Sequence, residues 1–180
     1  VFHAQALLVP EPEDRLMAIT TLPALEPLWQ YMKELAADSG QRESSFHSLL
    51  VGPLGCGKKD LLAALSIELA KVSAVAYLES PCWEVRSIDD FYAWVLSSIK
   101  GLEPDPELDA EQQLAELGQQ RALSLVIEDL QELFEALGEA GQKSLRAWLQ
   151  QNSWVSSWCA AKELFAEVSR QESMFYGFFR

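Results

Sequence analysis

The residue types and spacing in residues 52–59, GPLGCGKK, point most directly to chemistry. They follow the pattern G-x-x-x-x-G-K-[ST] except at the last position, where Lys59 replaces a hydroxyl side chain. In such a loop, backbone N–H groups and the N-terminus of the next helix bind phosphate, and the lysine contacts the β- and γ-phosphates. The predicted nucleotide-binding residues are Gly52, Pro53, Leu54, Gly55, Cys56, Gly57, Lys58, Lys59 and Asp60.

Lys59 changes what this loop is expected to do. The Ser or Thr of the usual pattern binds Mg²⁺ through its hydroxyl group, whereas an ammonium group repels the metal. A lysine can instead neutralise phosphate as a point charge. We therefore expect ATP to bind with little dependence on Mg²⁺. The alternative is a glycine-rich turn that binds no nucleotide.

A second pair of candidate residues, Glu128 and Asp129, follows the apolar run of residues 122–127. In P-loop ATPases, an acid at the end of a strand holds Mg²⁺, and a neighbouring residue orients the attacking water. Both carboxylates are therefore catalytic candidates, and Glu128 is also the candidate metal ligand. Their order is the reverse of the usual Asp-Glu, and a misplacement of about 1 Å can lower a rate about 100-fold. The alternative is that both acids cap the following helix.

Apolar runs alternate with amphipathic segments along the chain, and this alternation predicts the elements that position these residues. Strands are expected at 45–51, 72–80, 122–129 and 154–161. Helices are expected at 25–37, 58–71, 87–101, 109–120, 130–152 and 162–170. Ser87 is expected to cap the third of these helices, and Gly101 to end it. The pattern predicts an α/β fold with a parallel sheet covered by helices on both faces.

Two segments, LLVGPLGCGK and LVIEDLQELF, resemble the nucleotide-binding motifs of AAA+ ATPases. The similarity is greatest to the branch that includes origin-recognition-type, archaeal-type and signalling (STAND) ATPases. It implies a P-loop NTPase core, a three-layer sandwich, over residues 45–180. Residues 1–44 would form an N-terminal arm and a flanking helix. The helical lid of the family would follow residue 180, so we expect a chain truncated before the lid.

The resemblance also implies a polar sensor residue at the end of the strand at 154–161. The expected positions are Cys159, Ala160 and Ala161, none of which hydrogen-bonds well to a γ-phosphate. Ser157 or Lys162 would serve if the strand register differs.

The family's arginine finger follows this strand and acts on a neighbouring subunit. The candidates are Arg170 and Arg180, and a solvated surface arginine is the alternative interpretation of each.

The composition limits the partners. The net charge of −13 argues against a domain that binds nucleic acid by itself. No signal peptide or membrane-length apolar run is visible, and three widely spaced cysteines suit a reducing compartment. We therefore expect an intracellular protein, in the cytoplasm or nucleus, without a membrane partner. The chain begins with Val1, which suggests a fragment.

These departures from the motifs lead to one hypothesis with two alternatives. We expect an ATP-binding AAA+-like domain with impaired or absent hydrolysis, a structural or regulatory subunit of a larger assembly. Its partners would be other protein subunits, in a hetero- or homo-oligomer, with DNA reached indirectly or through other domains. The resemblance suggests origin recognition and replication, anti-phage defence or transposition. The alternatives are a slow but active ATPase and a protein–protein adaptor without nucleotide.

Overall fold

A four-stranded parallel β-sheet organises the computed structural model, which describes residues 26–39, 45–81 and 84–179. The strand order is β1-β4-β3-β2. The strands are β1 (His47–Val51), β2 (Ala74–Leu78), β3 (Leu123–Ile127) and β4 (Val155–Ala161). The expected α/β fold with a parallel sheet is confirmed, and each strand falls within its predicted range.

The register of the strands brings their carboxyl ends to one edge of the sheet. Val51 of β1 pairs with Ala161 of β4, and Ile127 of β3 pairs with Cys159. The central strands β3 and β4 are buried at every position, as expected for apolar strands that are covered on both faces. The loops after β1 and β3 therefore begin close to one another, and they carry the two predicted motifs.

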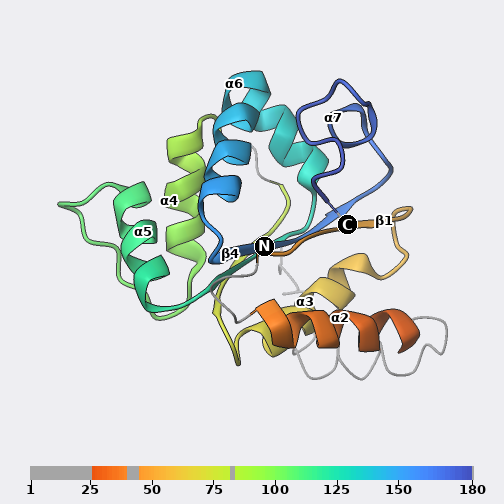
Figure 1. Cartoon of the computed structure of the whole chain (residues 1–180), viewed down its shortest axis with the longest axis horizontal. Helices are drawn as coiled ribbons and strands as arrows, with labels where there is room; N and C mark the ends of the chain where they lie inside the picture. The colour runs from red at the N-terminus through yellow and green to blue at the C-terminus, as the bar shows by residue number, and fades with distance from the viewer. Residues whose placement is uncertain (1–25, 40–44, 82–83, 180) are drawn as a thin grey trace, which may run out of the picture.

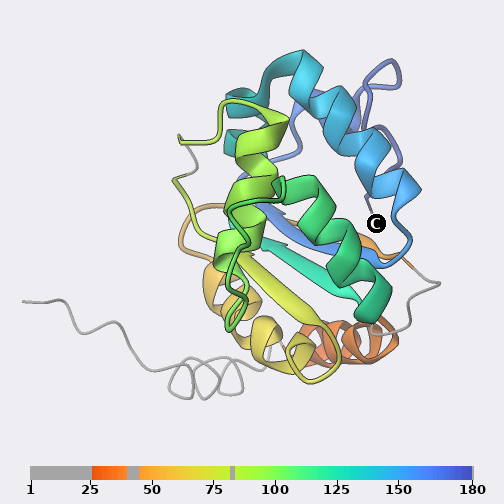
Figure 2. The same ribbon diagram turned by 90° about the vertical axis from the view of Figure 1, so that its left-hand side faces the viewer.

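Helices cover both faces of the sheet (Figures 1 and 2). One face carries α2 (Glu26–Ser39) and α3 (Lys58–Leu69). The other carries α4 (Ile88–Ser98), α5 (Ala110–Gln120) and α6 (Leu130–Gln151). β4 contributes to both cores, because Trp158 and Ala160 pack with α2 and α3, whereas Cys159 and Ala161 belong to the core on the α6 side.

The start of α4 agrees with the expected capping, whereas its end lies before the expected stop at Gly101. The Oγ of Ser87 accepts a hydrogen bond of 3.1 Å from the N–H of Asp90, so the predicted cap is confirmed. The helix ends at Ser98, and Gly101 lies in the turn that follows.

The last helix, α7 (Ala166–Ser169), is shorter than the predicted range of 162–170. Phe165 precedes it in an extended conformation and is buried, with its ring centroid 5.7 Å from that of Phe134. Packing of this ring holds Phe165 itself outside the helix, which begins at the next residue.

The predicted N-terminal arm lies outside the described residues, but the flanking helix is present as α2. Trp29 and Met32 of α2 are buried in one cluster with Leu61 and Leu65 of α3. Among the described residues, none of the helices combines the length and the apolar character needed to cross a membrane.

Candidate phosphate-binding site

The predicted phosphate-binding loop connects a strand to the N-terminus of a helix. β1 ends at Val51 and α3 begins at Lys58, so residues 52–57 form the loop. Gly57 is the N-cap of α3 and has a φ of 86°, a left-handed conformation that favours glycine. The strand–loop–helix arrangement that a phosphate-binding loop requires is therefore present.

The side chain of Lys58 lies against its own loop. Its Nζ donates hydrogen bonds to the carbonyl oxygens of Gly52, at 2.5 Å, and Pro53, at 2.8 Å. It also lies 3.6 Å from the Sγ of Cys56, which is exposed. The ammonium group that would contact phosphate is thus held at the loop by backbone carbonyls.

Lys59, at the position of the expected hydroxyl group, forms an ion pair with the first acid of the second motif. Its Nζ lies 2.6 Å from Oε2 of Glu128. The two side chains differ in exposure, with relative accessibilities of 61% for Lys59 and 8% for Glu128. The ion pair joins the first turn of α3 to the end of β3.

Two further donors hold the Glu128 carboxylate. The hydroxyl of Tyr77 donates to Oε1 at 3.1 Å, and the N–H of Ser80 donates to Oε2 at 3.1 Å. Glu128 therefore accepts from α3, from β2 and from the segment after β2. This carboxylate does not cap α6, so the capping interpretation is wrong for Glu128.

Asp129 caps α6. Its Oδ1 accepts from the N–H of Glu132 at 3.1 Å, and its Oδ2 lies 3.4 Å from the Nζ of Lys162. The capping interpretation therefore holds for Asp129, whose carboxylate also forms an ion pair.

The expected sensor residues occupy different environments along β4. Cys159, Ala160 and Ala161 are buried within the sheet, and burial raises the pKa of the Cys159 thiol to about 12. Ser157 is also buried, with its Oγ 2.9 Å from Nδ1 of His47. Lys162 is the first residue beyond the strand. Its Nζ forms the ion pair with Asp129, whereas the three first choices lie within the buried strand.

The candidate arginine fingers are only partly described. Arg170 is exposed and forms the C-cap of α7. Exposure suits both a finger that reaches a neighbouring subunit and a solvated surface residue. Arg180 lies outside the described residues.

The groups that would bind Mg²⁺ at this site are replaced or are paired with lysines. Lys59 supplies an ammonium group in place of a hydroxyl, and the carboxylates of Glu128 and Asp129 are each paired with a lysine. The glycine-rich loop, in contrast, offers backbone N–H groups suited to phosphate.

Sequence reasoning missed Tyr77 and Ser80, which hold Glu128. Their place in the sequence could have indicated them. Tyr77 lies in β2, and Leu78 of this strand pairs with Ile127 of β3. Polar residues near the carboxyl end of a neighbouring parallel strand lie beside the acid that follows β3.

Comparison with solved structures gives the same architecture. The chain is similar to Cdc6p of Pyrobaculum aerophilum, with 16% identity and a TM-score of 0.54 over 79% of this chain and 40% of that one. It is similar to the ORC2 protein of Aeropyrum pernix, with 10% identity and a TM-score of 0.57 over 79% and 42% of the two chains. It is also similar to Drosophila ORC bound to DNA, with 20% identity and a TM-score of 0.59 over 85% of this chain and 41% of that one.

The chain has the fold of an AAA+ base domain. It spans about two fifths of the length of the chains that it matches. No protein-family model and no curated protein matches the sequence. The similarity therefore concerns the fold. The chemistry of the site depends on the residues of this chain.

Proposed function

We propose that this chain is an ATP-binding AAA+-like domain in which hydrolysis is impaired or absent. The observation that carries the proposal is the ion pair between Lys59 and Glu128. The ammonium group of Lys59 lies between the phosphate-binding loop and Glu128. An ATPase of this fold would use an acid at the position of Glu128 to hold Mg²⁺.

Glu128 is poorly suited to a role in hydrolysis. A carboxylate that activates water or holds a metal needs free lone pairs, and Lys59, Tyr77 and Ser80 occupy three of the roughly four acceptor sites of this one. Its side chain is largely buried, so the loss of its partners would leave a charge with little access to water.

Nucleotide binding is supported by the intact part of the loop. The glycines, the N-terminus of α3 and Lys58 are all in place, and Lys58 needs only to exchange its carbonyl partners for phosphate oxygens. The related ORC2 protein of Aeropyrum pernix was solved in complexes with ADPNP and ADP. In this chain, Lys59 would neutralise part of the phosphate charge that Mg²⁺ neutralises in metal-dependent ATPases.

The domain would act as a structural or regulatory subunit within a larger intracellular assembly. The resemblance to Drosophila ORC, solved bound to DNA, supports a DNA-directed assembly such as one for origin recognition. The net charge of −13 makes direct binding of DNA by this domain unfavourable. Contact with DNA would therefore come from other domains or from partner subunits.

Equilibrium titration with a fluorescent ATP analogue, in Mg²⁺ and in EDTA, tests nucleotide binding. We expect saturable binding with similar dissociation constants in both conditions, and loss of binding in Lys58→Ala. Lys71→Ala is the matched control, since it removes an exposed lysine of the same charge that pairs with Glu68 away from the loop. Absence of saturable binding would leave the adaptor as the better explanation, and strong Mg²⁺ dependence would contradict the role of Lys59.

Turnover measurements separate impaired hydrolysis from a slow ATPase. We expect the phosphate release of the wild type to match that of Lys58→Ala. Turnover that is present in the wild type and lost in Lys58→Ala would establish an active enzyme and overturn the proposal.

A further inference from the structure

Lys59 and Glu128 form one ion pair, but their surroundings hold the two side chains unequally. The Glu128 carboxylate also accepts from Tyr77 and Ser80, and only 8% of its side chain is exposed. The Lys59 side chain is 61% exposed, and its Nζ contacts a single acceptor, Glu128, among the described residues. An ammonium group has three N–H donors, so two of them remain for other acceptors. Lys59 is therefore the partner that is able to exchange its contact.

The position of Lys59 in the loop relates it to the last phosphate of a nucleotide. In the usual pattern, the hydroxyl group at this position binds Mg²⁺, and the metal bridges the β- and γ-phosphates. A lysine side chain is longer than that of serine or threonine and carries its own positive charge. Lys59 therefore replaces the hydroxyl group and the metal together, and its charge serves the phosphates that the metal would bridge.

A triphosphate and a diphosphate differ in what they offer to Lys59. The loop N–H groups, the N-terminus of α3 and Lys58 contact the phosphates that the two ligands share. Departure of Lys59 would leave the buried Glu128 charge with neutral donors alone, so a weak competitor does not draw Lys59 away. A γ-phosphate adds negative charge and three acceptor oxygens beyond the part of the ligand that the loop encloses. It is the group that competes with the carboxylate.

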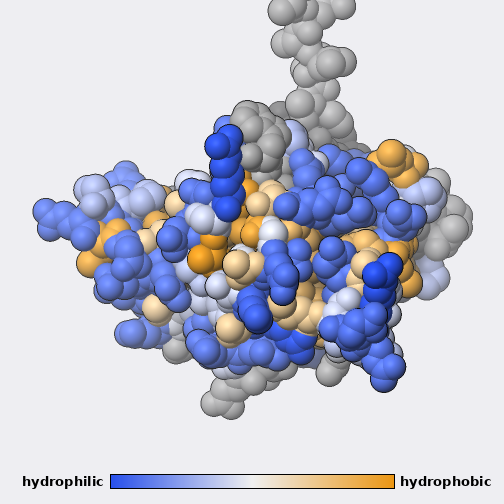
Figure 3. All heavy atoms as spheres, turned by 90° about the horizontal axis from the view of Figure 1, so that it is seen from above, coloured by the Kyte–Doolittle hydropathy of each residue, from blue (hydrophilic) through white to orange (hydrophobic). Residues whose placement is uncertain are grey.

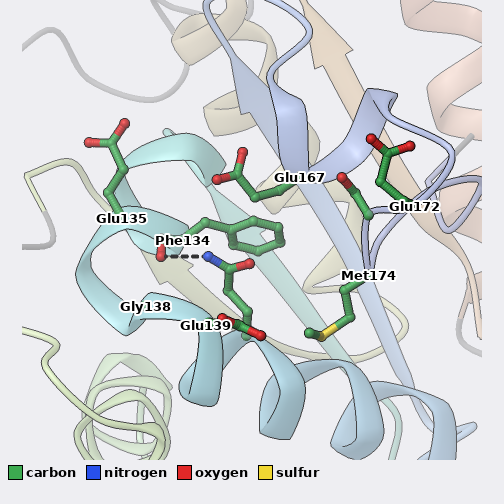
Figure 4. A pocket seen from close by; sticks show the side chains of 9 residues that line it. Phe134, Glu135, Gly138, Glu139, Glu167, Glu172 and Met174 are labelled. Carbon is green, nitrogen blue, oxygen red and sulfur yellow. Dashed lines mark hydrogen bonds between the residues drawn. The ribbon is translucent and has the colours of Figure 1, made fainter.

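A hollow on another face of the molecule is unsuited to phosphate. On the face that carries α6 and α7, hydrophilic residues surround an area of apolar ones (Figure 3). A hollow of about 640 Å³ lies between these helices, beside Gly138, where α6 is interrupted with a φ of 61° and a ψ of −177°. There the carbonyl of Phe134 accepts a hydrogen bond of 3.0 Å from Nε2 of Gln142. Figure 4 shows the lining, which includes the four glutamates Glu135, Glu139, Glu167 and Glu172. Their negative charge repels phosphate, whereas the glycine-rich loop attracts it.

Building on the proposed nucleotide binding, we propose that Lys59 determines which nucleotide this site prefers. Lys59 exchanges Glu128 for the terminal phosphate of a nucleoside triphosphate, and it stays on Glu128 when a diphosphate is bound. The ion pair that joins α3 to β3 is therefore present with the diphosphate and broken with the triphosphate. The chain distinguishes the two nucleotides without a metal and without cleaving the ligand.

The first test compares the two nucleotides in EDTA. The whole chain is titrated with a fluorescent β,γ-imido analogue of ATP and with the matching fluorescent ADP. For the wild type, we expect a dissociation constant at least about tenfold lower for the triphosphate. In Lys59→Met/Glu128→Gln, the two constants should lie within roughly twofold of one another. This double variant removes both charges of the pair, so it keeps the net charge and leaves no unpaired carboxylate in the interior.

A second ion pair provides the matched control. Lys71 lies 2.6 Å from Glu68 on the surface, three residues away along the chain. Lys71→Met/Glu68→Gln makes the same chemical change away from the loop, and it should keep the preference for the triphosphate.

The amide of Ser80 reports the exchange directly. Its N–H donates to Oε2 of Glu128, the same oxygen that Lys59 contacts, although Ser80 lies after β2 and outside the loop. In amide ¹H–¹⁵N spectra of the wild type, the Ser80 resonance should move on addition of the imido analogue and stay in place with ADP. In Lys59→Met/Glu128→Gln, the two nucleotides should have the same effect on it.

The results separate this inference from the proposal on which it rests. Absence of saturable binding of either nucleotide would overturn nucleotide binding and the role of Lys59 with it. Saturable binding with equal constants in the wild type, or a preference that the Lys59→Met/Glu128→Gln variant retains, would overturn the role of Lys59 alone. A Ser80 resonance that responds equally to both nucleotides in the wild type would contradict the exchange. The wild-type measurements decide the question even if the Lys59→Met/Glu128→Gln variant fails to fold.

Discussion

The Nζ of Lys59 and the Oε2 of Glu128 lie 2.6 Å apart and join the first turn of α3 to the end of β3. The partners come from the two motifs that an ATPase of this fold would use to position Mg²⁺. Under the proposed function, their mutual neutralisation would allow the loop to bind phosphate without the metal.

Replacing Lys59 with threonine should restore dependence on Mg²⁺. The substitution supplies a hydroxyl group and removes the ammonium group from Glu128. We expect the dissociation constant for an ATP analogue to become lower in Mg²⁺ than in EDTA by at least about tenfold, or roughly 1.4 kcal/mol. Lys59→Met removes the charge without adding a hydroxyl group, so it should not gain the same dependence. Equal behaviour of the two variants would contradict this account.

Removing the side chain of Asp129 should destabilise the protein through α6. Asp129→Ala loses both the N-cap and the contact with Lys162, and we expect a loss of about 1–2 kcal/mol in the free energy of unfolding. Asp129→Asn keeps a side-chain oxygen for the cap and should lose less than 1 kcal/mol, as a rough guide. Urea unfolding followed by circular dichroism measures both. An asparagine variant as unstable as the alanine variant would argue against capping as the main contribution.

Stability should depend on pH through His47. Burial lowers the pKa of this histidine from 6.5 to about 4, so the unfolded chain binds more protons than the folded one between these values. Stability therefore falls as the pH decreases through this window, by up to roughly 1.4 kcal/mol per pH unit. The measurement is the free energy of unfolding of the wild type and of His47→Gln between pH 7 and about 4.5. The variant should lack this part of the slope, and identical slopes would show that His47 does not contribute.

Gly138 should not tolerate a side chain. A Cβ atom at this position meets no atom within 4 Å, so space is not the obstacle. The combination of a φ of 61° and a ψ of −177° is accessible essentially to glycine alone. We expect Gly138→Ala to lower the free energy of unfolding by about 1–3 kcal/mol. The control is Ala140→Gly, an exposed site two residues later, which should lose no more than about 1 kcal/mol. A neutral Gly138→Ala would mean that the helix can continue through this position.

Local patterns predicted the sheet, the position of the loop and the placement of Glu128 and Asp129 after a buried strand. Each of these depends on residues close together in the sequence, whose apolar periodicity and glycine content are visible directly. The pairing of Lys59 with Glu128 was not predicted, because 69 positions separate the residues and the contact depends on how α3 sits against β3. Lys162 was only an alternative candidate, because its ion pair with Asp129 joins residues far apart in the sequence and depends on how β4 pairs with β3.

The break at Gly138 was missed for a different reason. The segment 130–152 has helical periodicity on both sides of the glycine, and a single glycine is tolerated in many helices. The interruption depends on the backbone angles of one residue and on Gln142 replacing the lost hydrogen bond at Phe134.

Glu128 and Asp129 are adjacent in the chain, yet they hold helices on opposite faces of the sheet. Glu128 is paired with the first turn of α3, and Asp129 is the N-cap of α6. The peptide bond between these two residues therefore connects α3 on one face of the sheet to α6 on the other. Binding of phosphate would require Lys58 to leave its carbonyl partners. If the N-terminus of α3 moved at the same time, the start of α6 would move with it through Glu128 and Asp129.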